Sequence, residues 1–247
     1  MKPVFFVING YEIYSYAIFN MLALLIGMTI FVIEAKRKNI DNKTIIIIMI
    51  SCLLGSSLGS KLPIWIYYSR SIIENLPDIK LLFTGRTVVG GIIGGWIFVE
   101  IAKRVGKIKV STGDLFAPAV AAGLVIGRIG CFLGGCCYGI ESHLPWACDF
   151  GDRVMRHPTQ IYSMIFDLGL FIYMVVIGRR PKREGFLFRR FLLLYFIFRF
   201  MIEFIRVTPK ILFFLSGFQL TSIVVFVYLA VTYFMKKDGR MTQKNFQ

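Results

Sequence analysis

Residues 15–33 read SYAIFNMLALLIGMTIFVI and contain no Asp, Glu, Lys or Arg. A helix that crosses the hydrocarbon core of a membrane needs about 20 mostly apolar residues. This run is followed at once by a charged segment that contains Lys36, Arg37 and Lys38. A cluster of cations directly after an apolar run is typical of a transmembrane helix that ends on the cytoplasmic side. The stretch therefore predicts a membrane span.

Six more apolar runs follow along the chain. We expect the full set of spans near residues 15–33, 44–64, 86–102, 114–133, 159–177, 187–206 and 217–235. Hydrophobic residues make up 56% of the 247 residues, and these runs leave no room for a separate soluble domain. We predict an all-α integral membrane protein of about seven transmembrane helices, with residues 1–247 forming a single polytopic membrane domain.

Loop charges test the number of spans and give the orientation. The cations gather after the first, third and fifth runs and in the C-terminal tail: Lys36, Arg37, Lys38, Lys43; Lys103, Arg104, Lys107, Lys109; Arg179, Arg180, Lys182, Arg183; Lys236, Lys237, Arg240, Lys244. The intervening loops hold acids, namely Glu74, Asp78, Glu141, Asp149 and Asp152. This alternation predicts an N-terminus outside and a C-terminus in the cytoplasm.

The same bias accounts for the formal net charge of +15, from 29 Lys and Arg against 14 Asp and Glu. We therefore expect no nucleic-acid partner. The N-terminus lacks a charged segment followed by a small-residue cleavage site, so we expect no removable signal peptide.

Glycines recur at four-residue spacing within three of the expected spans. Such spacing lets helix backbones approach closely in lipid. The pairs are Gly55/Gly59, Gly90/Gly94, Gly91/Gly95 and Gly123/Gly127. Helix packing explains most of them, and the dense run around Gly90 and Gly91 would also leave room for a bulky group such as a lipid headgroup.

The sixth run contains charged residues that are costly in lipid. An ionisable side chain near the bilayer centre costs at least about 2.5–3.5 kcal/mol, which makes it a functional candidate. Tyr195, Arg199, Glu203 and Arg206 are spaced four, four and three residues apart, so we expect them on one helical face. Two arginines exceed what one glutamate neutralises, as an anionic headgroup site would require. The alternatives are a self-neutralised structural pair or an Arg206 that reaches the outer surface.

Arg128 lies deep in the fourth run, between Gly127 and Gly130. Small neighbours leave space for its planar guanidinium, which suits bidentate phosphate binding. The alternative is that Arg128 caps carbonyls of a broken helix. Arg189 and Arg190 lie near the inner end of the sixth run, and we expect them to be cytoplasmic anchors.

Three cysteines gather near the outer end of the fourth run: Cys131, Cys136 and Cys137. With His143 and His157 they suggest zinc binding or thiol redox chemistry, but the chain has no spaced CxxC pair and the ligand set is irregular. We expect small-residue packing and no metal, with an extracytoplasmic disulfide and a zinc site as alternatives. We expect no cofactor, since there is neither a P-loop nor a glycine fingerprint after a strand.

Several motifs together resemble the prolipoprotein diacylglyceryl transferase family. They are Ser15-Tyr16, Gly90-Gly91, Asp114-Leu115-Phe116-Ala117-Pro118, Gly127-Arg128-Ile129-Gly130, His157-Pro158-Thr159-Gln160-Ile161-Tyr162 and Tyr195-x3-Arg199-Phe200-x2-Glu203-Phe204-x-Arg206. The resemblance runs through most of the chain. The family moves a diacylglyceryl group from phosphatidylglycerol to the lipobox cysteine thiol of a bacterial preprolipoprotein and releases glycerol 1-phosphate.

The resemblance implies a bacterial cytoplasmic-membrane enzyme, with phosphatidylglycerol and a lipobox-containing preprolipoprotein as its partners. Arg128 and Arg199 would hold the lipid phosphate, while Glu203 and Arg206 would orient them and the acceptor. Tyr16 and Tyr195 would line the site. The substrate contacts implied by the other motifs are Gly90, Gly91, Gly127, Gly130, His157, Gln160 and Tyr162.

The chain departs from the family pattern at several positions. The family's two Asn and its Glu after the Gly-Arg element are replaced by Cys131, Gly134 and Cys136, and its His before the paired glycines by Val89. Arg86 lies one turn away and is a candidate phosphate contact, although a permanently protonated Arg is a poor base.

Two other functions stay open at this point. One is a divergent paralogue that transfers a phospholipid-derived group to another acceptor, with Cys136 or Cys137 as a covalent nucleophile. The other is a non-catalytic lipid-binding or transport protein, since transporters also bury Arg/Glu pairs.

Overall fold

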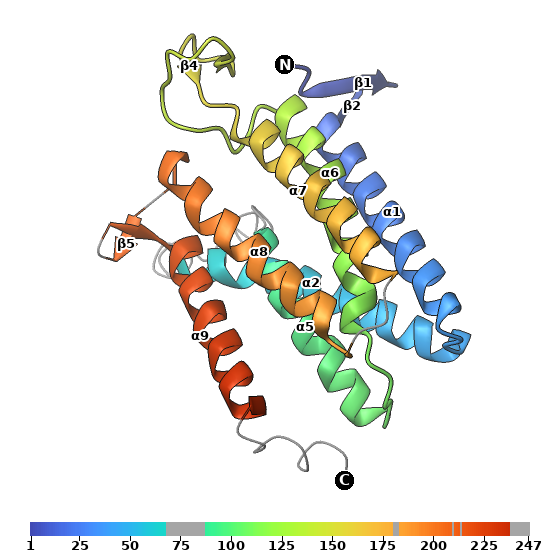
Figure 1. The fold of residues 1–247 in the computed structure, drawn as a ribbon. Coiled ribbons are helices and arrows are strands. Elements are labelled where there is room, and N and C mark those ends of the chain that lie inside the picture. The colour runs from blue at the N-terminus through green and yellow to red at the C-terminus, as the bar shows by residue number, and fades with distance from the viewer. Residues whose placement is uncertain (68–86, 180–182, 209, 213, 238–247) are drawn as a thin grey trace. The chain divides into compact units, whose positions relative to one another are not determined.

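The computed structural model describes residues 1–67, 87–179, 183–208, 210–212 and 214–237. Long helices dominate this part of the chain (Figure 1). They are α1 (Ser15–Arg37), α2 (Asn42–Tyr67), α5 (Val88–Val105), α6 (Gly113–Leu133), α7 (Thr159–Gly178), α8 (Phe186–Ile202) and α9 (Gly217–Lys237). Each coincides with one of the seven predicted spans to within a few residues at either end.

Five of these helices are long and apolar enough to cross a membrane. They are α1, α2, α6, α7 and α9. By contrast, α8 has only 17 residues, and α5 carries Glu100, Lys103 and Arg104 in its C-terminal half. The chain is thus a multi-pass, all-α membrane protein, while the count of seven spans and the orientation stay predictions.

The exposure of side chains also indicates a lipid environment. Leu25, Ile165 and Val224 are about three-fifths exposed, whereas Arg128, Asp167 and Glu203 are buried. In water, so many exposed apolar side chains would call for a partner surface. Acyl chains satisfy them without cost, and the charged groups are then confined to the protein interior.

The chain divides into two compact units, Met1–Phe31 with Gly113–Gln247, and Val32–Thr112. The expectation of a single membrane domain stays a prediction. In the second unit, α2 packs against α5. A Cβ atom added to Gly59 would lie 2.5 Å from the carbonyl oxygen of Gly90, and one added to Gly94 would meet the Gly55 carbonyl. The glycine spacing therefore serves helix packing, as the sequence predicts.

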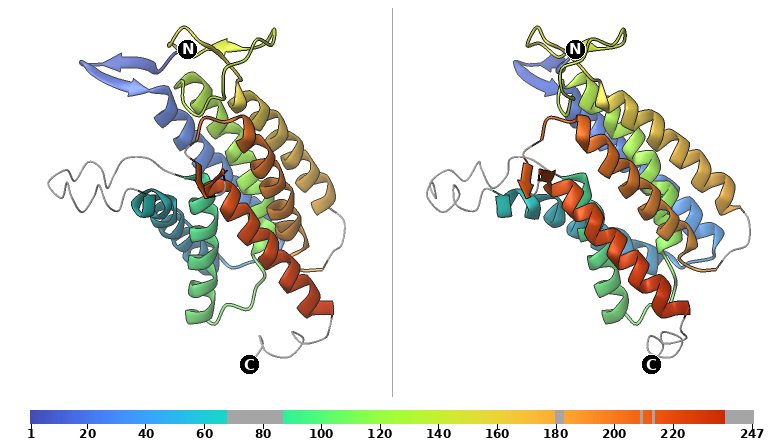
Figure 2. Two further views of the ribbon diagram at one scale, coloured as in Figure 1. Left: turned by 90° about the vertical axis from the view of Figure 1, so that its left-hand side faces the viewer. Right: turned by 60° about the vertical axis from the view of Figure 1, so that its left-hand side comes forward.

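In the first unit, α6, α7 and α8 lie side by side, and α9 packs against α8 (Figures 1 and 2). The rings of Phe166 on α7 and Phe198 on α8 stack with centroids 4.0 Å apart. Asp114, at the start of α6, accepts hydrogen bonds from the backbone N–H groups of Gly185 and Phe188. Its carboxylate thus caps the N-terminus of α8, where free N–H groups favour an anion.

Three short antiparallel hairpins complete the described fold. They are β1 (Val4–Ile8) with β2 (Tyr11–Tyr14), β3 (Cys148–Asp149) with β4 (Met155–Arg156), and β5 (Lys210–Leu212) with β6 (Leu215–Ser216). The first two lie at the end of the unit where α6 finishes and α7 begins (Figure 2).

One predicted boundary is wrong. The sixth span was expected to be helical to residue 206, but α8 ends at Ile202 and a 3₁₀ turn, η1, covers Glu203–Ile205. Arg206 already has extended backbone, with φ −94° and ψ 147°. The last turn tightens, as helix ends commonly do, so Arg206 does not continue the helical face of Tyr195 and Arg199.

Candidate active site

Charged side chains from α6, α7, α8 and the segment that follows α8 lie in the interior of the first unit. Arg128, Asp167, Arg199 and Glu203 are all buried, and the side chain of Arg206 is only 9% exposed. Three arginines against two carboxylates leave one positive charge when all five groups are ionised. That balance suits a singly charged phosphodiester.

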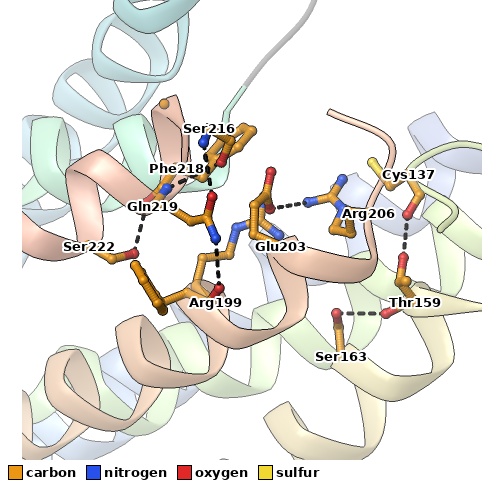
Figure 3. Close-up of polar contacts among 12 residues, drawn as sticks. Cys137, Thr159, Ser163, Arg199, Glu203, Arg206, Ser216, Phe218, Gln219 and Ser222 are labelled. Atoms are coloured by element: carbon orange, nitrogen blue, oxygen red, sulfur yellow. Dashed lines mark hydrogen bonds and ion pairs between the residues drawn. The ribbon is translucent and has the colours of Figure 1, made fainter. Parts of the chain in front are cut away.

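Glu203 joins two of the arginines (Figure 3). Its Oε2 lies 2.9 Å from Nη2 of Arg199 and 3.7 Å from Nη1 of Arg206. The carboxylate is fully buried, so both ion pairs lie in a low-dielectric setting. The spacing of four and three residues thus brings both arginines to Glu203, although Arg206 reaches it from beyond the helix end.

The start of α9 supports this pair. The guanidinium carbon of Arg199 lies 4.3 Å from the centroid of the Phe218 ring, a cation–π contact. Next to it, the side chain of Gln219 accepts a hydrogen bond from the backbone N–H of Ser216 and donates one to the carbonyl of Phe200 (Figure 3). The Phe218 ring thus packs on the Arg199 guanidinium, and the Gln219 bonds tie the start of α9 to the end of α8.

Arg128 belongs to the same group of charges. Tyr195 and Asp167 each interact electrostatically with both Arg128 and Arg199. Helices α6, α7 and α8 therefore bring the two predicted phosphate ligands together around a shared tyrosine and carboxylate.

Asp167 is a member of this centre that is not among the predicted site residues. It is buried in the middle of α7, an otherwise apolar span. A lone acid in such a run is itself a signal of function, because lipid does not tolerate an unpaired carboxylate. That signal was available in the sequence.

Several polar atoms in this centre have no hydrogen-bond partner within the described ranges. They are Nη1 of Arg199, Nε of Arg206, the hydroxyl of Tyr195 and both carboxylate oxygens of Asp167. Both carboxylate oxygens of Glu203 also lack a hydrogen bond, although Oε2 forms the ion pairs with the two arginines. Buried polar groups are normally satisfied, and exceptions ask for an explanation. Two guanidinium donors and a hydroxyl that are free in one place fit an anionic oxygen-rich ligand.

The chain turns sharply after α6 and brings cysteines together. Gly135 adopts a left-handed conformation with φ 67°, the N–H of Gly135 bonds to the Phe132 carbonyl, and the N–H of Cys136 bonds to the Cys131 carbonyl. This pair of bonds is a Schellman motif, which ends a helix and folds the chain back on its last turn. Cys136 is thereby placed over Cys131.

The start of α7 holds this turn. The Oγ1 of Thr159 donates to the carbonyl of Cys137 at 2.6 Å, and the Nε2 of Gln160 donates to the carbonyl of Cys136 at 2.6 Å. Gln160 is 1% exposed and its side-chain amide holds the cysteine turn, while the predicted contact of Gln160 with substrate stays a prediction. The three sulfur atoms lie within 4.8 Å of one another.

His157 and Tyr162 form a separate group on the outer segment. Nδ1 of His157 lies 3.2 Å from the Tyr162 hydroxyl, which also accepts a hydrogen bond from the indole N–H of Trp146. On the same segment, hydrogen bonds from Arg156 lower the pKa of Asp152. A contact of His157 or Tyr162 with substrate stays a prediction.

The remaining predicted residues fall into three places. A Cβ atom at Gly130 would lie 2.8 Å from the Phe19 side chain, so Gly130 permits close contact between α1 and α6. A Cβ atom at Gly127 would meet nothing nearer than 3.9 Å, so Gly127 is not needed for close packing. Tyr16 is 40% exposed beside the cysteine turn and interacts electrostatically with its thiols. Gly90 and Gly91 lie in the second unit, and Arg86 lies outside the described residues, as do the predicted loop charges at 74, 78, 180, 182, 240 and 244.

A groove of about 880 Å³ runs between α8 and α9. Its walls are mainly apolar, including Leu193, Ile197 and Phe226, and Arg183, Arg189 and Arg190 lie along it. An apolar groove with cations beside it is suited to a lipid. None of the buried charged residues described above lines it.

A polytopic helical membrane protein with a buried, net-positive charge centre is the class that the fold and site define. The profile of the prolipoprotein diacylglyceryl transferase family matches residues 3–235, and the chain belongs to that family. The phosphatidylglycerol–prolipoprotein diacylglyceryl transferase of Clostridium tetani is 34% identical over 217 residues, which cover 85% of this chain and 87% of the relative. That of Finegoldia magna is 33% identical and covers 92% of each chain, and that of Clostridioides difficile is 29% identical and covers 96% and 97%.

Proposed function

We propose that this protein transfers the diacylglyceryl group of phosphatidylglycerol to the lipobox cysteine thiol of a preprolipoprotein. The relatives that cover most of the chain bear the name of this reaction. Within the proposal, the enzyme works in the bacterial cytoplasmic membrane, with seven spans, its N-terminus outside and its C-terminus in the cytoplasm. Lipoprotein maturation is its role.

One observation carries the proposal, namely the guanidinium donors left free in a buried centre. Arg199 and Arg206 share the carboxylate of Glu203, yet Nη1 of Arg199 and Nε of Arg206 remain unpaired among the described atoms. A phosphate supplies oxygen acceptors and the missing negative charge together. Arg128 adds a third cation to the same centre.

The reaction places new charge on the phosphate. The acceptor thiolate attacks the glyceryl carbon that carries the phosphate oxygen; a C–S bond forms and the C–O bond breaks. The electron pair leaves with glycerol phosphate, whose charge rises from one negative unit toward two. Donors fixed in advance around that oxygen stabilise the transition state more than the substrate, which is the requirement for catalysis.

The groove along α8 and α9 offers a place for acyl chains. Its apolar wall includes Leu193 and Ile197, which lie on α8, the helix that carries Arg199 toward its C-terminal end. The groove is thus a candidate acyl-chain site apart from the arginines, because Leu193 and Ile197 lie on the face of α8 opposite to Tyr195 and Arg199. A lipid in this groove would also suit a transporter, but membership in a transferase family favours the enzyme.

The test is product analysis with purified full-length protein, phosphatidylglycerol vesicles and a lipobox peptide. Mass spectrometry should find the peptide with a diacylglyceryl thioether and an equal amount of glycerol phosphate. Arg128→Ala and Arg199→Ala should abolish both products, while Arg37→Ala, at an exposed ion pair with Glu34, should not. Lipid uptake without any covalent product would favour the transporter and refute the transferase.

A cellular test complements the first. A bacterium depleted of its own diacylglyceryl transferase should grow with this protein but not with its Arg128→Ala or Glu203→Gln variants. Equal rescue by those variants would remove the roles given to the two residues.

A further inference from the structure

Three thiols from a short stretch of chain converge at the outer end of α6. The Sγ atoms of Cys131, Cys136 and Cys137 all lie within 4.8 Å of one another. Zinc–sulfur bonds are about 2.3 Å long, which sets sulfur atoms about 3.8 Å apart around a tetrahedral ion. No pair of these sulfurs has to approach by more than about 1 Å, a shift within reach of side-chain rotation.

The backbone that carries the thiols is fixed from both sides. The Schellman motif at Gly135 places Cys136 over Cys131, and hydrogen bonds from Gln160 and Thr159 hold the carbonyls of Cys136 and Cys137. Cys137 also adopts φ 65°, which is unfavourable for a residue with a side chain. Strained residues that persist because their surroundings fix them cluster at functional sites.

The surroundings provide charge balance for an anionic metal centre. A divalent zinc ion with three thiolates carries one net negative charge. Arg128 and Arg206 both interact electrostatically with Cys137, and Arg128 also with Cys131. Figure 3 shows Cys137 facing the side chain of Arg206. Two guanidinium groups can thus compensate the centre.

One side of the cluster is accessible. Cys137 is exposed, and Cys131 and Cys136 are partly buried. Tyr16, which is 40% exposed, lies beside them. Structural zinc sites are closed by four protein ligands, whereas catalytic sites keep three and leave the fourth position to water or substrate. The cluster matches the second arrangement.

We propose that Cys131, Cys136 and Cys137 hold a zinc ion whose fourth position binds the acceptor thiol of the transfer reaction. The proposal rests on the proposed function for the identity of that thiol. Zinc deprotonates a thiol that coordinates it, and this supplies the nucleophile. The irregular spacing of the three cysteines predicts no metal, and their convergence becomes visible only in the fold.

The chemistry balances without a redox partner. The acceptor thiol displaces the zinc-bound water and releases its proton to solvent. Its sulfur then attacks the glyceryl carbon, a C–S bond forms, and the glycerol phosphate leaves with the electrons of the C–O bond. The neutral thioether is a weaker ligand than a thiolate, so water replaces it and the site is restored.

The first experiment is metal analysis of the full-length protein, purified in detergent with reductant and with zinc alone as the added metal. Equimolar zinc is expected in the wild type and in Cys148→Ser, whose thiol lies outside the cluster. Cys131→Ser, Cys136→Ser and Cys137→Ser should each lower zinc content severalfold. A wild type without zinc, or one whose intact mass reports a disulfide within the cluster, would overturn the proposal.

A second experiment tests the open position. Cobalt replaces zinc, and its visible absorption reports the ligand set. A peptide with a lipobox cysteine should shift and intensify the cobalt bands, and the same peptide with serine should not. An unchanged spectrum would overturn the role in acceptor binding.

Product analysis separates the two proposals. Transfer at full rate by metal-free protein and by the cysteine variants would refute the zinc site and leave the proposed function standing. Zinc binding with thiol ligation, but without any transfer product, would support the metal site and refute the proposed reaction.

Discussion

Oε2 of Glu203 lies 2.9 Å from Nη2 of Arg199, and both side chains are buried among membrane-type helices. Replacing one partner of a buried pair leaves the other charge uncompensated, which typically costs about 3–5 kcal/mol. Because Glu203 also faces Arg206, its loss would affect two cations. The pair is therefore a structural feature of the buried centre, and its catalytic role is a prediction.

Glu203→Gln should lower the free energy of unfolding in detergent by about 3–5 kcal/mol and abolish transfer of the diacylglyceryl group. Unfolding followed by intrinsic fluorescence gives the stability, and the peptide assay gives the activity. Glu34→Gln is the matched control, since its exposed pair with Arg37 should contribute at most about 1 kcal/mol. Equal effects of the two changes would contradict the role of the buried pair.

Asp167→Asn removes a negative charge from the neighbourhood of Arg128 and Arg199 with little change in shape. We expect kcat to fall about 10- to 100-fold, equivalent to about 1.4–2.7 kcal/mol, because the arginines lose the group that positions them. The KM for phosphatidylglycerol should stay the same or fall, since the centre becomes more positive. A higher KM at constant kcat would show that Asp167 only supports lipid binding.

Arg128→Lys keeps the charge but loses the planar fork. A lysine cannot offer two parallel donors to a phosphate, so we expect kcat/KM to fall about 100-fold, or about 2.7 kcal/mol. Arg104→Lys, at the basic end of α5, is the control and should leave kcat/KM unchanged. Activity of Arg128→Lys near the wild-type level would mean that charge alone suffices at this position.

Gln160→Leu should release the cysteine turn. The carbonyl of Cys136 loses its 2.6 Å hydrogen bond in a buried setting, which costs about 1–3 kcal/mol. Alkylation of the cluster thiols by a maleimide should become faster, as measured by peptide mass spectrometry. Thr29→Val, which removes only an exposed bond to its own helix, should change neither quantity. Unchanged alkylation in Gln160→Leu would show that the turn holds itself.

Reporter fusions test the orientation. A phosphatase that is active only outside the cytoplasm should be active when inserted in the β3–β4 segment, for example after Asp152, and inactive when fused after Lys237. The distribution of Lys and Arg predicts this result. Activity in the reverse pattern would invert the topology and place the cysteine cluster in the cytoplasm.

The positions of the helices could be predicted from the sequence because the information is local. A backbone in lipid must satisfy its own hydrogen bonds, so each apolar run of sufficient length becomes a helix whatever its neighbours are. The runs at 15–33 and 159–177 accordingly match α1 and α7 at their N-terminal ends. The burial of Arg128, Arg199 and Glu203 could also be predicted, because a charge within an apolar span is kept away from lipid.

Only the tertiary structure decided which groups meet. Asp167 on α7 interacts electrostatically with Arg128 on α6 and Arg199 on α8 because the three helices pack side by side, and no spacing along the chain encodes that arrangement. Gln160 proved to hold the cysteine turn, through a bond to a backbone carbonyl 24 positions earlier. Such contacts depend on helix packing and on the end of α6, which are properties of the whole unit.

The positions of the three cysteines and of Arg206 were likewise decided by the tertiary structure and not by the sequence pattern. Their irregular spacing gave no metal signature, yet a left-handed glycine and two side-chain hydrogen bonds bring three sulfurs within 4.8 Å. Arg206 left the predicted helical face because the last turn of α8 tightens into η1. An uninterrupted apolar run of sufficient length determines the middle of a transmembrane helix. The ends of a helix are determined by the hydrogen-bond partners that the surrounding structure offers to its last N–H and C=O groups.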